Sequence, residues 1–396
     1  MIQFFTNRVC QQVYTQKEIE MKPRIYLNKL LITLIVDARH FYAKSVKRWS
    51  RGNETIKTLF ITEDNRISKS QIFPFYFYKK EFRQRWDVEF REVNFDLLEP
   101  NRSLVQLADI IFFQPWFIRG EERIVEVLLK IREVNSSAKV IFLDAYAPLD
   151  LRYAKDVESL INVYVKKQFF SDYSEYAKAT YGDTNLVEYY NRLFNIPDLE
   201  KVQFNVPTEF INKLHLGPGF FTSRKMLPTF TLSDKPVFSE KTIDVHARLA
   251  VKGSDWYQAM REHALLMCNK VKTNSIISSE LVSFRQYWKE LEAARICFSP
   301  FGYGEVCWRD YEAIMSGALL IKPDMSHIKM EPNIFIPFVT YIPISWDFSD
   351  LPEKIEYYLR NKEEREEITK AAYSVLHNYF QEKDFINQFS SVFSQN

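Results

Sequence analysis

The residues whose chemistry stands out most lie in one stretch of the second half of the chain, from Phe298 to His327. An apolar run is followed there by a glycine-containing loop, a helical pattern and a second apolar run. The loop and helix carry Gly302, Gly304, Glu305, Arg309 and Glu312. Backbone N–H groups at a helix N-terminus favour phosphate, and glycine lets a ligand come close to the backbone. The pattern predicts a ligand site where a buried strand leads into a helix.

Glu305 has two interpretations at this stage. It contacts a bound ligand, or it is an acid placed at the start of the helix by the helix macrodipole. A second charged group, formed by His246, Arg248 and Lys252, ends the apolar run 241–249. Fixed cations at such a point stabilise negative charge that develops on a leaving group. The alternative is ordinary surface charge beyond a strand.

Five more residues are expected at strand ends or just beyond them. Lys322, Ser326 and His327 follow the apolar run after the motif helix, and we expect this loop to border the same cleft. Ser326 alternatively caps the next turn of helix. In the first half of the chain, Asp37 and Asp144 each end an apolar run. A carboxylate there acts as a general base on a hydroxyl, or is a cap or loop residue.

Several familiar kinds of site are excluded by their motifs. Cys307 stands where a dinucleotide fingerprint requires a third glycine, and the chain has neither a P-loop nor the GxSxG turn of hydrolases. The absence of a DxD pair and of HExxH gives no support for a metal site. A net charge of +2 gives no drive toward nucleic acid. The four cysteines lack CxxC spacing, which favours a reducing compartment.

The elements that must position these residues alternate along the chain. Strands are predicted at 29–37, 55–61, 108–116, 139–146, 161–167, 241–249, 273–278, 295–300, 317–323 and 340–348. Helical patterns are predicted at 121–135, 254–268, 278–294 with a capping box, the motif segment and 351–380. Strand–helix–strand order implies parallel sheets, so the fold class is α/β.

The chain is long enough for two domains. We expect an N-terminal segment at 1–22, a first domain at 23–200, a proline-bearing linker at 201–240, a second domain at 241–368 and a tail helix at 369–396 that crosses back. Two such domains leave a cleft between them, where small molecules bind. The apolar run 30–36 is too short to span a bilayer and no signal peptide precedes it, so we expect a soluble, cytoplasmic protein.

The motif segment resembles the donor-binding segment of GT-B glycosyltransferases, in particular exostosin-like and group 1-like sugar transferases. The similarity rests on Gly302, Gly304, Arg309 and Glu312 and on the apolar run that leads to His327, and it covers roughly residues 240–360. It implies two Rossmann-like domains with parallel sheets facing across a cleft. It also implies a nucleotide-diphosphate sugar, UDP- or GDP-linked, in the second domain, a glycan or glycoconjugate acceptor in the first, and no metal or other cofactor.

The resemblance also implies roles for individual residues. Glu312 would accept hydrogen bonds from the ribose hydroxyls, Arg309 would face the same cleft, Arg248 and Lys252 would neutralise the diphosphate, and Glu305 would contact the sugar. Two spacings depart from the family by one residue: the two glutamates and the Arg–Lys pair each stand one residue closer. Whether the enzyme retains or inverts the anomeric configuration stays open.

Two alternatives to sugar transfer remain from the sequence, and one further segment is ambiguous. The chain is a catalytically silent module that binds nucleotide sugars or glycans, or it is a GT-B enzyme that epimerises or hydrolyses the nucleotide sugar. Residues 73–86, which mix aromatic and basic side chains, stack acceptor sugars, touch an anionic membrane surface, or bury their aromatics with the cations outside. The oligomeric state is open.

Overall fold

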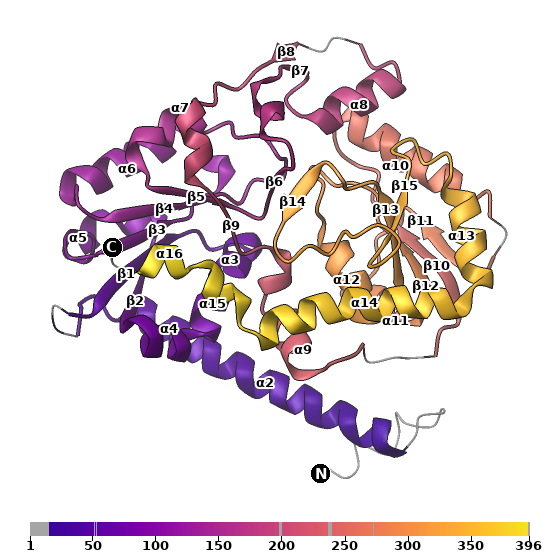
Figure 1. The fold of residues 1–396 in the computed structure, drawn as a ribbon, viewed down its shortest axis with the longest axis horizontal. Helices are drawn as coiled ribbons and strands as arrows, with labels where there is room; N and C mark the ends of the chain where they lie inside the picture. The colour runs from indigo at the N-terminus through magenta and orange to yellow at the C-terminus, as the bar shows by residue number, and fades with distance from the viewer. Residues whose placement is uncertain are drawn as a thin grey trace.

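The computed structural model describes residues 16–394, except residues 51, 53, 198, 199, 237–239 and 272, and it describes side chains from residue 25 on, apart from Pro100. Two Rossmann-like domains, each built around a parallel sheet, stand side by side (Figure 1). This arrangement confirms the expected α/β fold class. Residues 1–15, most of the expected N-terminal segment, lie outside the described residues.

The first sheet has six strands and the second has five. In spatial order, the first sheet contains β2 (Val88–Asn94), β1 (Ile56–Thr62), β3 (Ile110–Phe113), β4 (Lys139–Leu143), β5 (Val163–Lys166) and β9 (Leu214–Leu216). The second contains β11 (Ser275–Ser278), β10 (Ile243–Arg248), β12 (Ala294–Phe298), β13 (Leu319–Pro323) and β15 (Ile342–Ile344). The pairings within both sheets are parallel, as strands with nearly continuous apolar sequence suggest.

Helices cover these sheets and connect the strands. The first half contains α2 (Gln16–Ser45), α3 (Arg66–Phe77), α4 (Lys79–Trp86), α5 (Arg102–Gln106), α6 (Glu121–Val134), α7 (Ala154–Val157), α8 (Asn185–Leu193) and α9 (Leu227–Leu232). The second half contains α10 (Asp255–Cys268), α11 (Phe284–Ala293), α12 (Trp308–Ser316), α13 (Leu351–Arg360), α14 (Lys362–Gln381), α15 (Asp384–Gln388) and α16 (Ser390–Phe393). Among the residues that the structure describes, no helix combines the length and apolar character needed to cross a bilayer.

One predicted element is wrong, and two strands of the first sheet are not among the predicted ones. Residues 29–37 belong to helix α2 rather than to a strand. Leu30, Leu31 and Leu34 lie on its exposed side and the opposite side packs on the domain, so the apolar run is not buried on both sides as a central strand would be. Strand β2 was not expected, since its charged sequence is typical of a surface segment. Strand β9 lies inside the expected linker and completes the first sheet.

Two further segments differ in detail. Helix α11 begins at Phe284, where the side chain of Ser283 accepts the N–H of Gln286, so the capping residue lies further along than the expected box. Residues 73–86 form the end of α3 and helix α4. Phe75, Phe82 and their aromatic neighbours are buried, with the α4 cations outside. This favours the purely structural interpretation of that segment.

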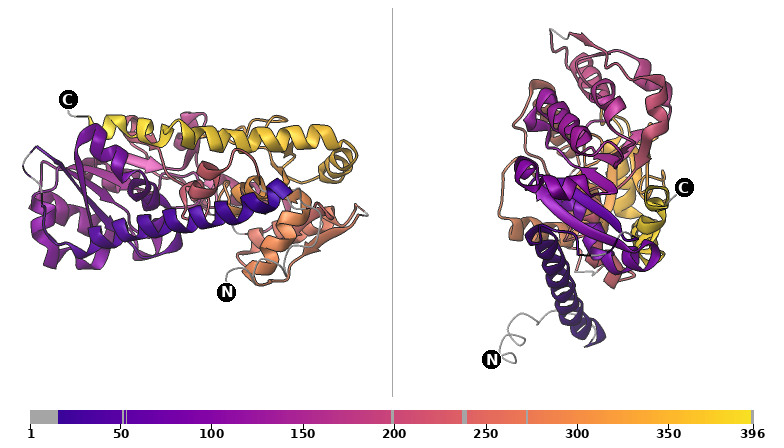
Figure 2. Two further views of the ribbon diagram at one scale, coloured as in Figure 1. Left: turned by 90° about the horizontal axis from the view of Figure 1, so that it is seen from below. Right: turned by 90° about the vertical axis from the view of Figure 1, so that its left-hand side faces the viewer.

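The hydrophobic core extends through both domains. Phe75 of α3 and Phe112 of β3 lie in the same cluster as the second-domain strands. Helix α14 and the short helices after it run from the second domain back to the first (Figures 1 and 2). Phe385 and Phe389 pack edge-on against Phe75, each with ring centroids 5.1 Å apart. The other face of the first sheet has a separate core under α6.

A two-stranded antiparallel sheet joins the domains at their junction. Strand β6 (Gln168–Phe170) follows β5 of the first domain, and β14 (Ile328–Met330) follows β13 of the second. A second small sheet, β7 (Thr180–Tyr181) with β8 (Lys201–Val202), lies at the edge of the first domain. The β6–β14 pairing fixes the C-terminal ends of the two large sheets next to each other, so residues that follow those strands can meet.

Candidate active site at the domain junction

Helix α12 begins at the junction because a buried charge network holds its first turn. Asp310 accepts the backbone N–H of Cys307 at 2.7 Å and the hydroxyl of Ser299 at 2.6 Å. Lys322 completes the network, with its Nζ 3.2 Å from Asp310, and is itself fully buried. Lys322 therefore lies in the interior beneath α12, not at the cleft where the sequence placed it.

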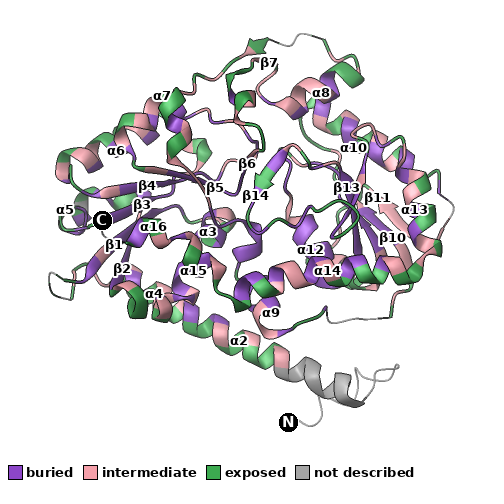
Figure 3. Ribbon diagram, in the orientation of Figure 1, coloured by how far each residue is buried: buried purple, intermediate pink, exposed green. Residues whose placement is uncertain are grey.

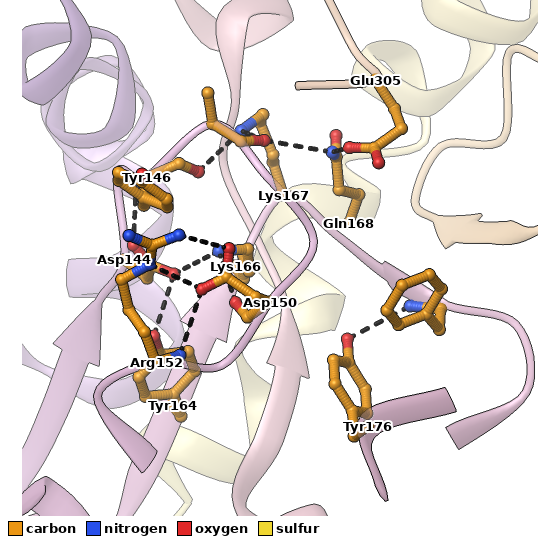
Figure 4. Close-up of polar contacts among 12 residues, drawn as sticks. Asp144, Tyr146, Asp150, Arg152, Tyr164, Lys166, Lys167, Gln168, Tyr176 and Glu305 are labelled. Carbon is orange, nitrogen blue, oxygen red and sulfur yellow. Dashed lines mark hydrogen bonds and ion pairs between the residues drawn. The ribbon is translucent and has the colours of Figure 1, made fainter. Parts of the chain in front are cut away.

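Glu305 lies just before α12 and faces the first domain. Its side chain is fully buried, and its Oε2 accepts a hydrogen bond of 3.0 Å from Nε2 of Gln168 (Figure 4). Its Oε1 has no hydrogen-bond partner and lies 4.0 Å from Nε2 of His327. Both ring nitrogens of His327 lack a partner as well. Buried polar atoms are normally satisfied, so this carboxylate–imidazole pair is a natural place for a ligand to bind.

The two glycines of the loop before α12 lie where backbone segments come into close contact. The N–H of Gly302 donates to the carbonyl of Gly304 at 3.0 Å. A Cβ on Gly304 would stand 2.2 Å from the carbonyl oxygen of Ala147, which belongs to the loop after β4. Lys167 donates to the carbonyls of Tyr146 and Ala147 and so fixes that loop (Figure 4). Gly304 thus allows close approach, but the approaching group in this structure is the first domain.

The two aspartates considered as bases take other positions. Asp144 follows β4, as expected, but its oxygens accept the N–H of Tyr146 at 2.7 Å, the hydroxyl of Tyr164 at 2.9 Å and an ion pair with Lys166 (Figure 4). Asp37 lies on α2 and pairs with Arg224 at 2.6 Å, so the strand end assigned to it does not exist.

Glu312 lies on α12 and also faces the first domain. The hydroxyl of Tyr287 donates to its Oε2 at 2.8 Å, and Nη2 of Arg66 lies 4.0 Å from its Oε1. The Arg66 guanidinium lies over the ring of Trp308, 3.9 Å from its centroid. The side chain of Glu312 is 8 % exposed, so it is almost completely buried at the junction.

A cavity of 660 Å³ opens beside Arg66 and Trp308. Its charged lining is mainly basic and consists of Asp37, His40, Lys44, Asp64, Arg66, Lys69, Arg224 and Lys225. Nζ of Lys225 lies over the ring of Trp288 at 2.9 Å. Burial lowers the pKa of Lys225 to about 7. We call this space the basic cavity; it suits an anionic group.

A second cavity of 690 Å³ is lined by residues of the first domain between Asp150 and Val206, together with Trp346 of the second domain. Its aromatic lining consists of Phe170, Tyr176, Tyr189, Phe204 and Trp346, and it includes several carboxylates. The ring of Trp346 also packs against His327, with centroids 5.0 Å apart. This aromatic cavity therefore lies next to the Glu305–His327 pair.

Some of the basic side chains near the end of β10 already have hydrogen-bond partners within the protein. Arg248 donates two hydrogen bonds to the carboxylate of Glu290, at 2.5 and 2.9 Å. Arg309 donates to the carbonyl of Arg248, and its Nη1 has no partner. Burial lowers the pKa of His246 to about 3, so its ring is neutral. Lys252 lies exposed in the loop after β10.

Ser326 does not cap a helix, because β14 follows it. Its hydroxyl donates to the carboxylate of Asp324, and its carbonyl accepts the hydroxyl of Ser171 at 3.1 Å. Within the described part of the chain, no three His, Cys, Asp or Glu side chains come together as metal ligands.

Sequence reasoning missed the residues that the first domain contributes. Gln168 was hidden because it directly follows the Lys–Lys end of β5, and Arg66 and Lys225 stand in segments without a recognisable motif. Asn65, directly before Arg66, is a residue type that favours helix N-caps, so the sequence contains a signal for the start of α3. In the structure its side chain accepts two backbone N–H groups.

No family model matches the chain, and no curated protein matches it. Solved structures similar to it include Anabaena HepE in complex with UDP-glucose, at 8% identity over 85% of this chain and 98% of that one, with a TM-score of 0.45. TarM has 10% identity over 74% of this chain and 58% of that one, with a TM-score of 0.41. A putative UDP-N-acetylglucosamine 2-epimerase from Listeria monocytogenes has 11% identity over 83% and 95%, with a TM-score of 0.35. At this level the likeness says nothing of activity. The order and direction of the strands in its own two sheets give the chain the GT-B arrangement of two Rossmann-like domains.

Proposed function

We propose that the protein transfers a sugar from a nucleotide-diphosphate sugar to a hydroxyl of a glycan or glycoconjugate, with the reacting groups at the start of α12. One observation carries this proposal. Glu305 and Glu312 both face the first domain, with the aromatic cavity near Glu305 and the basic cavity near Glu312. An extended donor with a diol at one end and a sugar at the other matches two carboxylates presented in this way.

The donor's nucleotide would bind at Glu312. A carboxylate accepts both hydroxyls of a ribose, and Tyr287 already holds one oxygen of Glu312 in position. Arg66 lies 4.0 Å from Glu312, Lys225 also lines the basic cavity, and Arg309 has an unpartnered N–H group. These cations would offset the charge that the diphosphate gains as the sugar bond breaks.

The sugar and the acceptor would meet at Glu305. Aromatic rings such as Trp346 offer apolar faces on which sugar rings pack, which suits the aromatic cavity to an acceptor glycan. The acceptor oxygen would bond to the anomeric carbon as the bond to the diphosphate breaks, and the hydroxyl proton would pass to a base. His327 and Glu305 have free acceptor positions for that proton, whereas Asp144 has its oxygens occupied.

Access to Glu305 requires movement in this proposal. Gln168 and the backbone contact between Gly304 and Ala147 close the junction over the carboxylate. The donor would bind as the two loops part at that contact, while the core that extends through both domains keeps them together.

A thermal-shift screen with UDP-, GDP-, dTDP- and ADP-sugars tests the donor, because a ligand that binds the folded state raises its apparent stability. Calorimetry with the matching nucleotide sugar then compares Glu312→Ala with Glu353→Ala, a surface glutamate on α13. We expect at least a tenfold loss of affinity for the first and none for the second, in line with about 1.5–3 kcal/mol for a charged hydrogen bond. Unchanged affinity in Glu312→Ala would contradict the assignment. Donor consumption without any acceptor would instead indicate a hydrolase or an epimerase.

A further inference from the structure

Helix α2, the longest helix of the structure, turns an apolar side toward solvent. It runs along the outside of the first domain and extends beyond it (Figures 1 and 2). Its large exposed apolar side chains are Tyr26, Leu27, Leu30, Leu31, Leu34, Ile35, Phe41 and Tyr42, with exposed fractions from 44 to 73 %. The described part of α2 is mostly green on its outer side in Figure 3. Contiguous apolar patches of this kind mark interaction sites.

Several cations of α2 lie on the docked side. Arg39 donates to the carbonyls of Tyr76 and Phe77, and both His40 and Lys44 pair with the buried carboxylate of Glu92 on β2. Lys29 likewise hydrogen bonds to Thr229 of α9. These cations of α2 therefore contact the domain, whereas most of its leucines face solvent. This is the reverse of the usual arrangement of a surface helix.

The exposed residues have the spacing of a helix–helix seam. Leu27, Leu31, Leu34, Ala38 and Phe41 follow one another at intervals of four, three, four and three residues. This is the heptad rhythm of helices that pack along their length. Between residues 25 and 45, the charged side chain of Asp37 is 44 % exposed, and it is paired with Arg224, so it leaves no unpaired charge on this face. Two copies of this face would meet without repulsion.

We propose that the exposed face of α2 packs against the same face of a second copy of the chain, as an antiparallel helix pair around a two-fold axis at Leu34. With that axis, Leu27 of one copy faces Phe41 of the other, and the two Leu34 side chains meet. The exposed apolar side chains offer on the order of 800 Å² per copy, which is what each partner contributes to an interface of standard size.

A lipid surface fits this face less well. Helices that lie on anionic membranes carry free lysine or arginine beside their apolar side. Within residues 25–45 of α2, where side chains are described, the cations Arg39, His40 and Lys44 are directed into the domain, where carbonyls and Glu92 hold them. Over residues 25–45 the charge pattern therefore favours a protein partner with the same apolar seam.

Sedimentation velocity of the full chain tests the proposal, and a dimer is expected. Leu34→Glu places two carboxylates at the axis and is expected to give monomers, while Leu266→Glu, at an exposed leucine of α10, leaves the dimer intact. Circular dichroism confirms that each variant is folded. Mixing Leu34→Glu with Leu34→Lys should restore dimers, because opposite charges then meet at the axis.

A wild-type chain that stays monomeric throughout the concentration series would overturn the proposal. So would dimers that persist in Leu34→Glu, since the interface would then lie elsewhere. Monomers that bind vesicles of phosphatidylcholine and phosphatidylglycerol, and lose that binding in Leu34→Glu, would assign the face to a membrane instead.

Discussion

The ion pair of Asp144 with Lys166 shows how a residue at a strand end can serve structure alone. Both side chains are buried, at 3 % and 0 % exposure, and the carboxylate has two further donors. Removing one partner of a buried pair leaves an uncompensated charge, which costs about 3–5 kcal/mol. We expect Asp144→Asn to lower the free energy of unfolding by this order, measured in urea.

The exposed pair of Asp64 with Lys69 is the matched control, since such pairs contribute about 0–1 kcal/mol. If Asp144→Asn were no more destabilising than Asp64→Asn, the interior role assigned to Asp144 would be wrong.

Lys225 gives the proposed donor site a pH dependence. Burial lowers its pKa to about 7, and a lysine is cationic only below its pKa. The charge of a diphosphate diester stays constant from about pH 6 to 8, so donor binding should weaken as pH rises through this range, by roughly tenfold for one charged contact. The bound diphosphate itself stabilises the cation and moves the midpoint upward.

Calorimetry across this range checks the sign of the effect. Lys225→Arg keeps its charge over the whole range and should bind with little pH dependence. Equal slopes in the two proteins would show that another group titrates.

At the scale of elements, the sequence predicts the second domain well and the edge of the first domain badly. The strands β10, β12 and β13 have apolar sequences and lie where their hydrophobicity indicates. Strand β2 buries Glu89, Arg91 and Glu92, so its sequence is typical of a surface segment. His40 and Lys44 of α2 neutralise Glu92, while Glu89 and Arg91 pair with each other. The sequence of α2 is in turn typical of a buried strand. Both misassignments involve one contact, because Glu92 of β2 is buried against His40 and Lys44 of α2.

The candidate site likewise contains residues that a local motif predicts and residues that only the packing of the domains brings together. Glycines and glutamates of the second domain follow a local motif, so their positions at the start of α12 could be predicted. Gln168 and Arg66 reach that helix only through the packing of one domain on the other, and no local pattern records a contact between segments more than a hundred residues apart.

The loop before α12 and the loop after β4 form a contact that one methyl group can test. A Cβ at Gly304 would stand 2.2 Å from the carbonyl oxygen of Ala147, and backbone cannot yield as a side chain does. Overpacking of this kind costs about 1–3 kcal/mol. Gly304→Ala should therefore lower the Tm and speed hydrogen exchange of the loop around Ala147.

Gly52→Ala provides the control, because nothing lies within 4 Å of the added carbon. Exchange around Ala147 that matches the wild type in Gly304→Ala would mean that the junction is more open than the structure shows.

The whole molecule is held together by its C-terminal end. Helix α14 leaves the second domain, the hydroxyl of Tyr78 donates to the carbonyl of Phe380 at 3.1 Å, and α15 and α16 then cover the first sheet. Phe389 lies against Phe75 and Phe112. Because these rings belong to the core that extends through both domains, the tail should couple their unfolding.

Phe389→Ala tests this coupling. Truncation of a buried phenylalanine costs about 3–5 kcal/mol, and the loss falls on the first domain while the second keeps its own sheet and helices. We expect calorimetry to show two thermal transitions in place of one, with the lower transition belonging to the first domain. Phe338→Ala, at a half-exposed ring of the second domain, should keep a single transition near the wild-type temperature. One transition shifted as a whole in Phe389→Ala would mean that contacts other than the tail bind the two domains into one cooperative unit.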